Sequence, residues 1–303
     1  MRFCVHWPAC CPQGVHARSM RPPCARRTRM VPLPNPEEWR VTSVRIQLLG
    51  CVEVRTGKGE AVDVPEGARR LLTCLAWNPN DMVTDDTMVD RIWDSCCPQH
   101  PRQTLYTHAA RLRKALREVA DTELPVEVHR RRGGYLLSCD ETAIDLFRFR
   151  GTVQRARAHA RAEEPQEALR LFEEALALWR GMPLSGLSSH WADSVRAALG
   201  HEYRAAIVRL IGLSLRHGGC DEYLPVLHRV SADHPLDERI AGLLMITLYR
   251  SGRQGEALDS FSAIRRQMID ELGDEPGQQL RSLHAQILKR DSSLHIDDFA
   301  RVN

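Results

Sequence analysis

The sequence predicts an α+β domain followed by an all-α domain, and two observations support this. Between Val44 and Asp140, the apolar residues trace three strand-like segments, three helical segments and a strand hairpin, in that order. From about Ile144 nearly to the end of the chain, they follow the helical period alone. The 303 residues are enough for two domains, and a hydrophobic content of 43% can supply both cores.

The first domain is expected to begin with short strands, because "VRIQLLG", "CVEVRTG" and "AVDVP" alternate between apolar and polar residues. The segment "EGARRLLTCLAWNPN" then reads as a helix, and "TDDTMVDRIW" as a second helix with Thr84 as its N-cap. The side chains expected to face inward are Leu71, Leu72, Leu75, Ala76, Met88, Val89, Ile92 and Trp93.

The third helix, "PRQTLYTHAARLRKAL" from Pro101 to Leu116, has an apolar stripe and a basic face. At about 100° per residue, the stripe contains Leu105, Ala109, Leu112 and Leu116. The opposite face contains Thr104, Thr107, Arg111 and Lys114, flanked by His108, Arg113 and Arg117. After it, "PVEVHRRRGGYLLSCD" predicts a hairpin, with three arginines preceding Gly133 and Gly134.

The second domain is predicted to consist of short helical hairpins. The segment "PQEALRLFEEALALW" and the later "RQGEALDSFSAIRRQM" share the opening E-A-L-x-x-F, which is typical of tetratricopeptide-like repeats. Their separation of 89 residues is no multiple of about 34 residues, so an irregular array is expected, with an ordinary helical bundle as the alternative.

The composition excludes several classes of protein. The net charge is only +3, so nucleic-acid binding requires local clustering of basic residues. No run of about 18 apolar residues predicts a membrane span, and the first residues do not resemble a secretory signal. The ten irregularly spaced cysteines are typical of reduced thiols, so a cytoplasmic location without a membrane partner is expected.

Residues 1–40 are predicted to form a disordered arm, because prolines interrupt them and they show no period. An over-long gene start, with the initiator at Met30 or later, is the alternative. Metal-ligating residue types occur there, but their spacing matches no closed zinc pattern, so no metal is expected. These residues are Cys4, His6, Cys10, Cys11, His16 and Cys24.

Catalytic motifs are missing from the sequence. It contains neither of the glycine-rich phosphate-binding motifs, and no G-x-S-x-G elbow. "HEYRA" at His201 begins like H-E-x-x-H but has Ala205 at the second histidine position, and "CCPQH" at Cys96 lacks a complementary pair. We therefore expect neither an enzyme nor a cofactor.

The basic helix and the hairpin together predict a DNA-binding surface, since a helix fits the major groove and a wing reaches the adjacent backbone. Thr107 and Arg111 are expected to contact base edges. Phosphate contacts are expected from Arg102, Thr104, His108, Arg113 and Lys114, and from Arg131 and Arg132 on the wing. His108 is equally explained as a neutral packing residue, and Arg113 as part of a structural salt bridge.

Residues 44–140 resemble an OmpR-type winged helix-turn-helix: "TLYTHAARLRKAL" is similar to its recognition helix and "RRRGGYLL" to its wing. Arg132 stands where that wing usually has glycine, which predicts a turn formed by Gly133, Gly134 and Tyr135. The remainder, ending in "DELGDEPGQQLRSLH", resembles the bacterial transcriptional activator domain. Together they resemble the Streptomyces antibiotic regulatory protein (SARP) family, in a small form.

This resemblance implies an α+β winged helix-turn-helix domain followed by an all-α tetratricopeptide-like helical domain. The expected limits are 1–40 for the arm, 41–142 and 143–291 for the two domains, and 292–303 for a tail. It also implies a pathway-specific activator of antibiotic biosynthesis genes. Such a protein binds direct repeats in promoter double-stranded DNA as a homodimer and recruits RNA polymerase holoenzyme. The alternatives are a protein-interaction scaffold and a ligand-sensing regulator.

Overall fold

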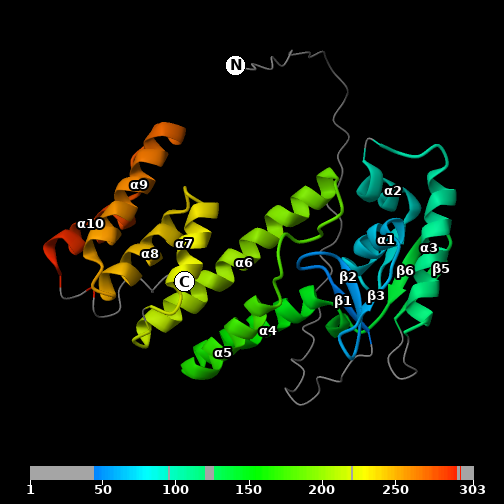
Figure 1. The fold of residues 1–303 in the computed structure, drawn as a ribbon, viewed down its shortest axis with the longest axis horizontal. Helices are drawn as coiled ribbons and strands as arrows, with labels where there is room; N and C mark the ends of the chain where they lie inside the picture. Colours follow the sequence, from blue (N-terminus) through cyan, green and yellow to red (C-terminus); the bar gives the residue numbers. More distant parts are fainter. Residues whose placement is uncertain (1–43, 95, 120–125, 220, 292–293, 295–303) are drawn as a thin grey trace, which may run out of the picture. The chain divides into compact units, whose positions relative to one another are not determined.

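The computed structural model describes residues 44–94, 96–119, 126–219, 221–291 and 294, and confirms the predicted fold class (Figure 1). The predicted arm lies outside these residues, as does all of the predicted tail except Leu294. The first elements are β1 (Val44–Gln47), β2 (Glu53–Thr56), β3 (Ala61–Val62), α1 (Glu66–Ala76), β4 (Met82–Thr84), α2 (Asp85–Trp93), α3 (Pro101–Arg117), β5 (Glu127–Arg131) and β6 (Gly134–Ser138).

The first part contains two small antiparallel sheets besides its three helices, with strand orders β1-β2-β3 and β4-β6-β5. Strand β4 is an addition to the predicted order, because three residues are too short to show a strand period. Its Val83 lies opposite Tyr135 of β6. A Cβ on the neighbouring Gly134 would lie 2.3 Å from the Val83 carbonyl oxygen, so glycine is required for β4 and β6 to pair.

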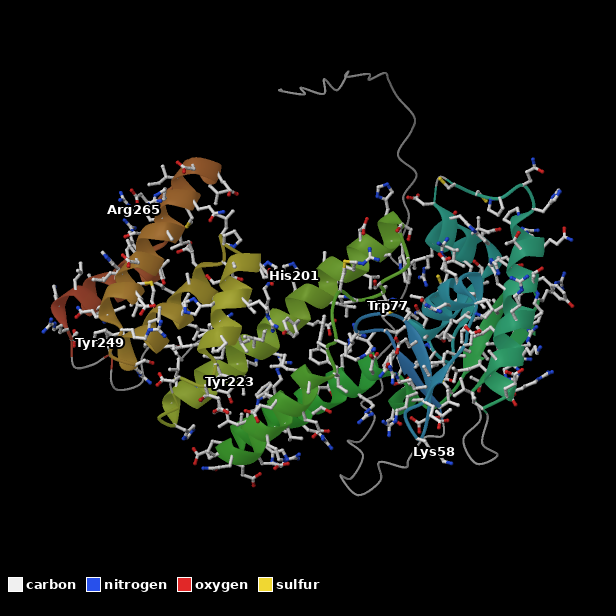
Figure 2. All side chains as sticks on the ribbon, in the orientation of Figure 1. Lys58, Trp77, His201, Tyr223, Tyr249 and Arg265 are labelled. Atoms are coloured by element: carbon white, nitrogen blue, oxygen red, sulfur yellow. The ribbon has the colours of Figure 1, made fainter. Side chains whose placement is uncertain are left out.

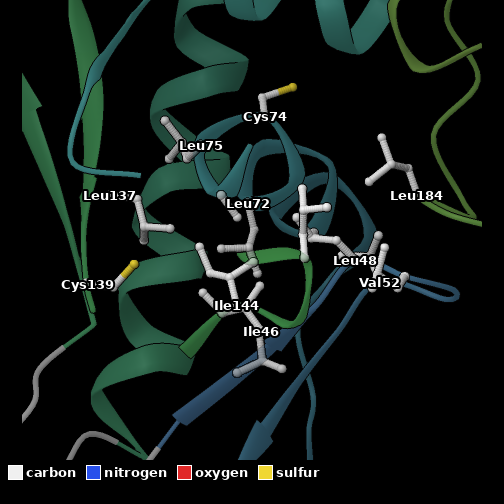
Figure 3. Close-up of a cluster of buried hydrophobic side chains, with 14 of the residues drawn as sticks. Ile46, Leu48, Val52, Leu72, Cys74, Leu75, Leu137, Cys139, Ile144 and Leu184 are labelled. Carbon is white, nitrogen blue, oxygen red and sulfur yellow. The ribbon is translucent and has the colours of Figure 1, made fainter. Parts of the chain in front are cut away.

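The predicted inward faces of the helices are confirmed. The side chains of α1 and α3 predicted to face inward are essentially inaccessible to solvent, and those of α2 are buried or half-buried. Thr84 caps α2 as predicted, its hydroxyl accepting a hydrogen bond from the Thr87 amide. Figure 3 shows Leu72 and Leu75 of α1 beside Ile46 of β1, Leu137 of β6 and Ile144 from the next part of the chain.

The second part of the described chain is helical; most consecutive helices pack against one another, and α6 packs against α8 (Figure 1). Ala168 and Phe172 near the start of one helix, and Ala257 and Phe261 near the start of another, are buried, so the repeated E-A-L-x-x-F opening supplies packing residues. The elements are the short η2 (Glu141–Ala143), α4 (Asp145–Arg161), α5 (Pro165–Ala177), α6 (His190–Arg216), α7 (Leu224–Asp233), α8 (Glu238–Arg250), α9 (Gln254–Leu272) and α10 (Gln278–Lys289).

One of the two hydrophobic cores crosses the junction between the two parts. One core runs from Val44 to Leu210 and combines the sheets and helices of the first part with side chains of α4, α5 and α6. The other runs from Ile207 to Leu294 and contains the C-terminal half of α6 together with α7 to α10. Leu146 and Phe149 of α4 therefore belong to the same core as the winged-helix elements. The limit between residues 142 and 143 remains a proposal.

Asp145, at the start of α4, joins the two parts by polar contacts. Its buried carboxylate accepts hydrogen bonds from the amides of Leu48 (2.7 Å) and Leu49 (3.1 Å), and from the Arg180 guanidinium (3.3 Å). Burial raises the pKa of Asp145, and the two amides and Arg180 oppose that rise. The amide of Arg180 in turn donates to the Leu49 carbonyl at 2.9 Å. This junction fixes the loop after β1 against the helical part.

A second contact lies between α2 and the start of α6. The Ser189 hydroxyl, which caps α6, donates to the Arg91 carbonyl at 2.7 Å. The Arg91 guanidinium lies 4.8 Å from the centre of the Trp191 ring, and Trp191 packs edge-on against Trp77 at 6.1 Å. The winged-helix elements thus contact the helical part at both β1 and α2.

Candidate nucleic-acid interface

Helix α3 is held by its apolar stripe, which leaves its basic face in solvent. Leu105, Ala109 and Leu112 are completely buried and Leu116 is 2% exposed. Pro101 occupies the first turn, where its missing amide hydrogen costs nothing, and Lys114 and Arg117 lie near the negative end of the helix dipole. Figure 2 shows nitrogen-tipped side chains along the outer side of α3.

Thr107, Arg111 and Lys114 are exposed on this outer face, and Thr104 is half-buried. The hydroxyls of Thr104 and Thr107 donate to the carbonyls of residues four positions earlier, at 3.0 and 3.1 Å. Among the described residues, no carboxylate pairs with Arg111 or Lys114. Both charges are therefore available to an anionic partner.

Arg102 lies at the start of α3 and forms an ion pair with Asp86 of α2, at 3.2 Å. The two side chains are 73% and 81% exposed, so solvent screens the pair and its contribution to stability is below about 1 kcal/mol. A phosphate can compete with Asp86 for this guanidinium.

His108 faces the protein rather than the solvent. Its ring stacks on Trp93 with centroids 6.1 Å apart, and a Cβ on Gly67 would lie 2.1 Å from a ring atom. Burial lowers the pKa of His108, and the nearby charges of Arg111 and Arg70 lower it further. These contacts favour the interpretation of His108 as a neutral packing residue.

This placement predicts that His108 makes folding sensitive to acid. The pKa of His108 in the folded protein lies below the ordinary histidine value of about 6.5, so the unfolded chain binds more protons as the pH falls through and below that value. The free energy of unfolding should therefore fall between pH 7.5 and 5.5, and less so in His108→Phe, which keeps the stacking on Trp93. Urea unfolding at the two pH values measures this, and an identical pH dependence in both proteins would contradict it.

Arg113 is half-buried and contacts the hairpin. Its Nε donates to the Val128 carbonyl of β5 at 2.7 Å, and its guanidinium lies 5.8 Å from the Tyr135 ring centre. The partner is a backbone carbonyl and an aromatic ring rather than the carboxylate of the salt bridge considered from the sequence. Arg113 thus connects α3 to β5.

The wing consists of β5, a turn at Arg132 and Gly133, and β6. Gly133 has φ of 82°, which favours glycine, and its carbonyl accepts from the Asp85 amide at 2.9 Å. The turn predicted at Gly133, Gly134 and Tyr135 is thus wrong for two of its three residues, because Gly134 pairs with Arg131 and Tyr135 with Arg130 in the sheet. Arg131 and Arg132 are exposed, and neither side chain forms a hydrogen bond or ion pair within the described chain.

Arg130, the first of the three arginines, anchors the wing. Its guanidinium donates to both carboxylate oxygens of Asp85, with Nη2 to Oδ2 at 2.8 Å, and lies 4.5 Å from the centre of the Tyr135 ring. The hydrogen bond from Arg130 lowers the pKa of Asp85. The charge of Arg130 is thus partly neutralised within the protein.

The exposed face of α3 also contains Tyr106, which the sequence reasoning did not select. Its side chain is 63% exposed and lies on the side of the helix nearer the wing. The helical period alone places Tyr106 at the edge of the face opposite the apolar stripe, so its angular position was the available signal.

No group of three or more histidine, cysteine or acidic side chains suited to a metal ion occurs in the described ranges. The cysteine- and histidine-containing set of the predicted arm lies outside those ranges. Within the same part of the chain, no helix is both long and apolar enough to span a bilayer.

The chain matches two known domain families and several known proteins. Residues 59–137 match the model "Transcriptional regulatory protein, C terminal", and residues 144–288 match "Bacterial transcriptional activator domain". Transcriptional regulator RedD of Streptomyces coelicolor is 36% identical over 84% of this chain and 73% of its own length. Regulatory protein DnrI of Streptomyces peucetius is 27% identical over 83% of this chain and 94% of its own length.

Larger proteins match over part of their length. Regulatory protein AfsR of Streptomyces griseus is 32% identical over 83% of this chain but only 25% of AfsR. The solved structure "Mycobacterium tuberculosis EmbR in complex with low affinity phosphopeptide" superposes with a TM-score of 0.75 and 25% identity, over 86% of this chain and 67% of EmbR. The chain belongs to the Streptomyces antibiotic regulatory protein family of transcriptional regulators.

Proposed function

We propose that this protein is a sequence-specific activator that binds promoter double-stranded DNA through α3 and the wing. The supporting observation is that Arg111 and Lys114 on α3, and Arg131 and Arg132 on the wing, are exposed without carboxylate partners in the described ranges. Arg113 joins α3 to β5 of the wing, and Arg130 joins the wing to Asp85 of α2. A helix with exposed cations fits the major groove of DNA, and a wing held rigidly beside it can contact the adjacent phosphate backbone at the same time.

The roles that we assign to the individual side chains follow their exposure. Thr107 and Arg111 contact base edges, whereas Lys114, Arg102 and Thr104 contact phosphates from α3. Arg131 and Arg132 contact the backbone or the minor groove beside the wing. His108 and Arg113, which the sequence also nominated, position α3 instead of touching DNA.

The biological role that we propose is that of the family to which this chain belongs. The protein activates antibiotic biosynthesis genes of one pathway in the cytoplasm, binds promoter direct repeats as a homodimer and recruits RNA polymerase holoenzyme. Residues 41–142 supply DNA binding and residues 143–291 supply the contacts of the activator domain. We assign it no catalytic activity and no cofactor.

Single substitutions on α3 should separate base recognition from phosphate contact. Arg111→Ala should cost about 1–3 kcal/mol of binding free energy and relax specificity at one base pair. Lys114→Ala should weaken binding to all sequences alike and reduce the slope of log affinity against log salt by about 0.9. Mobility-shift titrations of the full chain on promoters adjoining its gene, at several salt concentrations, measure both effects.

Thr107→Ser, which keeps the hydroxyl, is the control for disturbance of the helix and should alter specificity less than Arg111→Ala. Unchanged affinity and specificity in both Arg111→Ala and Lys114→Ala would exclude α3 as the recognition helix.

A further inference from the structure

Four arginines of the helical part lie near one another without a carboxylate partner in the described chain. Other guanidinium groups of this part do pair with carboxylates, as Arg170 does with Glu167, Arg253 with Glu256 and Arg265 with Glu275. No carboxylate partner occurs, within the described ranges, for the four that we call the arginine cluster. These are Arg157 and Arg161 of α4, Arg209 of α6 and Arg239 of α8.

The packing of α4 and α6 brings two of them together. The two helices are joined by Arg150 and Glu202, whose side chains form two hydrogen bonds of 2.9 and 2.7 Å. Both helices run in the same direction from this point (Figure 1). Arg157 and Arg209 each lie seven residues further on, two turns or about 10.5 Å along their helices, so each returns to the side of its helix that carries Arg150 or Glu202, and the charge of Arg157 acts on Arg209. Arg161 follows Arg157 by one more turn on the same face.

The start of α8 adds the fourth charge. The turn before it is held against α6 because the Arg204 guanidinium lies 3.0 Å from the His234 ring nitrogen and 3.9 Å from the Asp237 carboxylate. Arg239 lies in the first turn of α8, beside this contact. Burial lowers the pKa of Arg209, and the charges of Arg157, Arg239 and Arg161 lower it further. The charges of Arg157, Arg161 and Arg239 therefore all act on Arg209, and none of the four forms an ion pair with a carboxylate in the described part of the chain.

A cavity adjoins the cluster at Arg239. Its volume is about 740 Å³, and its lining includes Pro235 and Leu236 as well as the acidic Asp237, Glu238 and Glu271. The phosphates of a DNA duplex continue along the backbone, so those next to the cluster would be repelled by these carboxylates. A short acidic segment can end at the cluster and place an apolar side chain in the cavity. The mixed surroundings therefore favour a peptide over a nucleic acid.

We propose that the arginine cluster docks an acidic segment of a partner protein, with its carboxylates on the four guanidinium groups and a neighbouring apolar side chain in the adjoining cavity. Guanidinium groups bind carboxylates in a bidentate manner, which suits recognition of this kind. The site is separate from α3 and the wing, so it does not depend on the DNA-binding proposal.

The probe is a fluorescein-labelled ten-residue peptide of eight Asp and Glu residues around two Leu, titrated against the full chain by fluorescence anisotropy. The double variant R157A/R209A should bind it at least tenfold more weakly than the unmodified protein. The control R253A/R265A removes two charges from arginines that are paired with Glu256 and Glu275 on or beside α9, and should bind within twofold (Figure 2 labels Arg265). Thermal unfolding establishes that both variants are folded.

Two further measurements test whether the cluster instead binds DNA or a second copy of this chain. A loss of promoter affinity in R157A/R209A as large as that of Arg111→Ala would mean that the cluster binds DNA, and would overturn the proposal. A change of molecular mass in solution would assign the cluster to contact between two copies and would overturn it too. If R157A/R209A and R253A/R265A bind the peptide equally well, the proposal is also overturned.

Discussion

A fragment comprising residues 40–142 is expected to lose cooperative folding, although it contains every element of the proposed DNA-binding half. The core around α1 and β1 is completed by side chains from beyond the cut, among them Ile144, Leu146 and Phe149, which are at most 1% exposed. Burying each such side chain contributes about 1.5–3 kcal/mol, so losing these three and Leu184 removes about 6–12 kcal/mol. That equals most of the roughly 5–15 kcal/mol by which a domain is stable.

The matched control is residues 40–219, which retain α4, α5 and α6 and hence the whole of the first core. Urea unfolding followed by circular dichroism should give a sigmoidal transition for residues 40–219 and none for residues 40–142. A cooperative transition in the shorter fragment would show that the junction at Asp145 is dispensable.

The single substitution Asp145→Ala addresses the same junction in the full chain. It leaves the amides of Leu48 and Leu49 and the Arg180 guanidinium without their buried acceptor, at a cost of about 3–5 kcal/mol. The exposed pair of Glu167 and Arg170 provides the comparison, because Glu167→Ala should cost less than about 1 kcal/mol.

Removing the exposed charges of α3 and the wing together should have the largest effect on function. The variant with Arg111, Lys114, Arg131 and Arg132 all changed to Ala loses four proposed contacts with DNA. At about 1 kcal/mol each, promoter affinity should fall roughly 10³-fold near physiological salt. The slope of log affinity against log salt should fall by about three to four, at about 0.9 for each phosphate.

The control variant removes four cations of α9 and its surroundings, namely Arg253, Arg265, Arg266 and Lys289. Its net charge is the same, so it reports the effect of overall charge on association. If both variants lose affinity equally, the loss reflects net charge, and the assignment of the contacts to α3 and the wing fails.

The fold was largely predictable because most elements carry strong periodicity. The stripe of α3 and the cap at Thr84 depend on residues close in sequence, so local rules identify them. Strand β4 was missed because its three residues form a strand only by pairing with β6, more than fifty residues later. The shared core was missed for a similar reason, since contact between β1 and α4 is a tertiary property.

The candidate site was predictable in its exposed residues and less so in its inward ones. The helical period separates Arg111 and Lys114 from the apolar stripe without knowledge of the neighbours. His108 and Arg113 lie at the edges of the basic face, where the helical angle alone does not predict whether a side chain faces solvent or packs on the protein. The positions of Trp93 and β5 decide this for each of them. The role of Arg130 could not be predicted either, because its partner, the Asp85 carboxylate, lies 45 residues earlier in the sequence.

Photo-crosslinking tests most directly whether α3 and the wing meet one duplex together. A benzophenone amino acid is placed in the full chain at Thr107 on α3, at Arg132 on the wing or at the exposed Ser262 on α9, and each protein is irradiated on labelled promoter DNA. We expect crosslinks from positions 107 and 132, at neighbouring sites within the same repeat, and none from 262. Crosslinks no more frequent from 107 and 132 than from 262 would contradict binding of DNA by this surface.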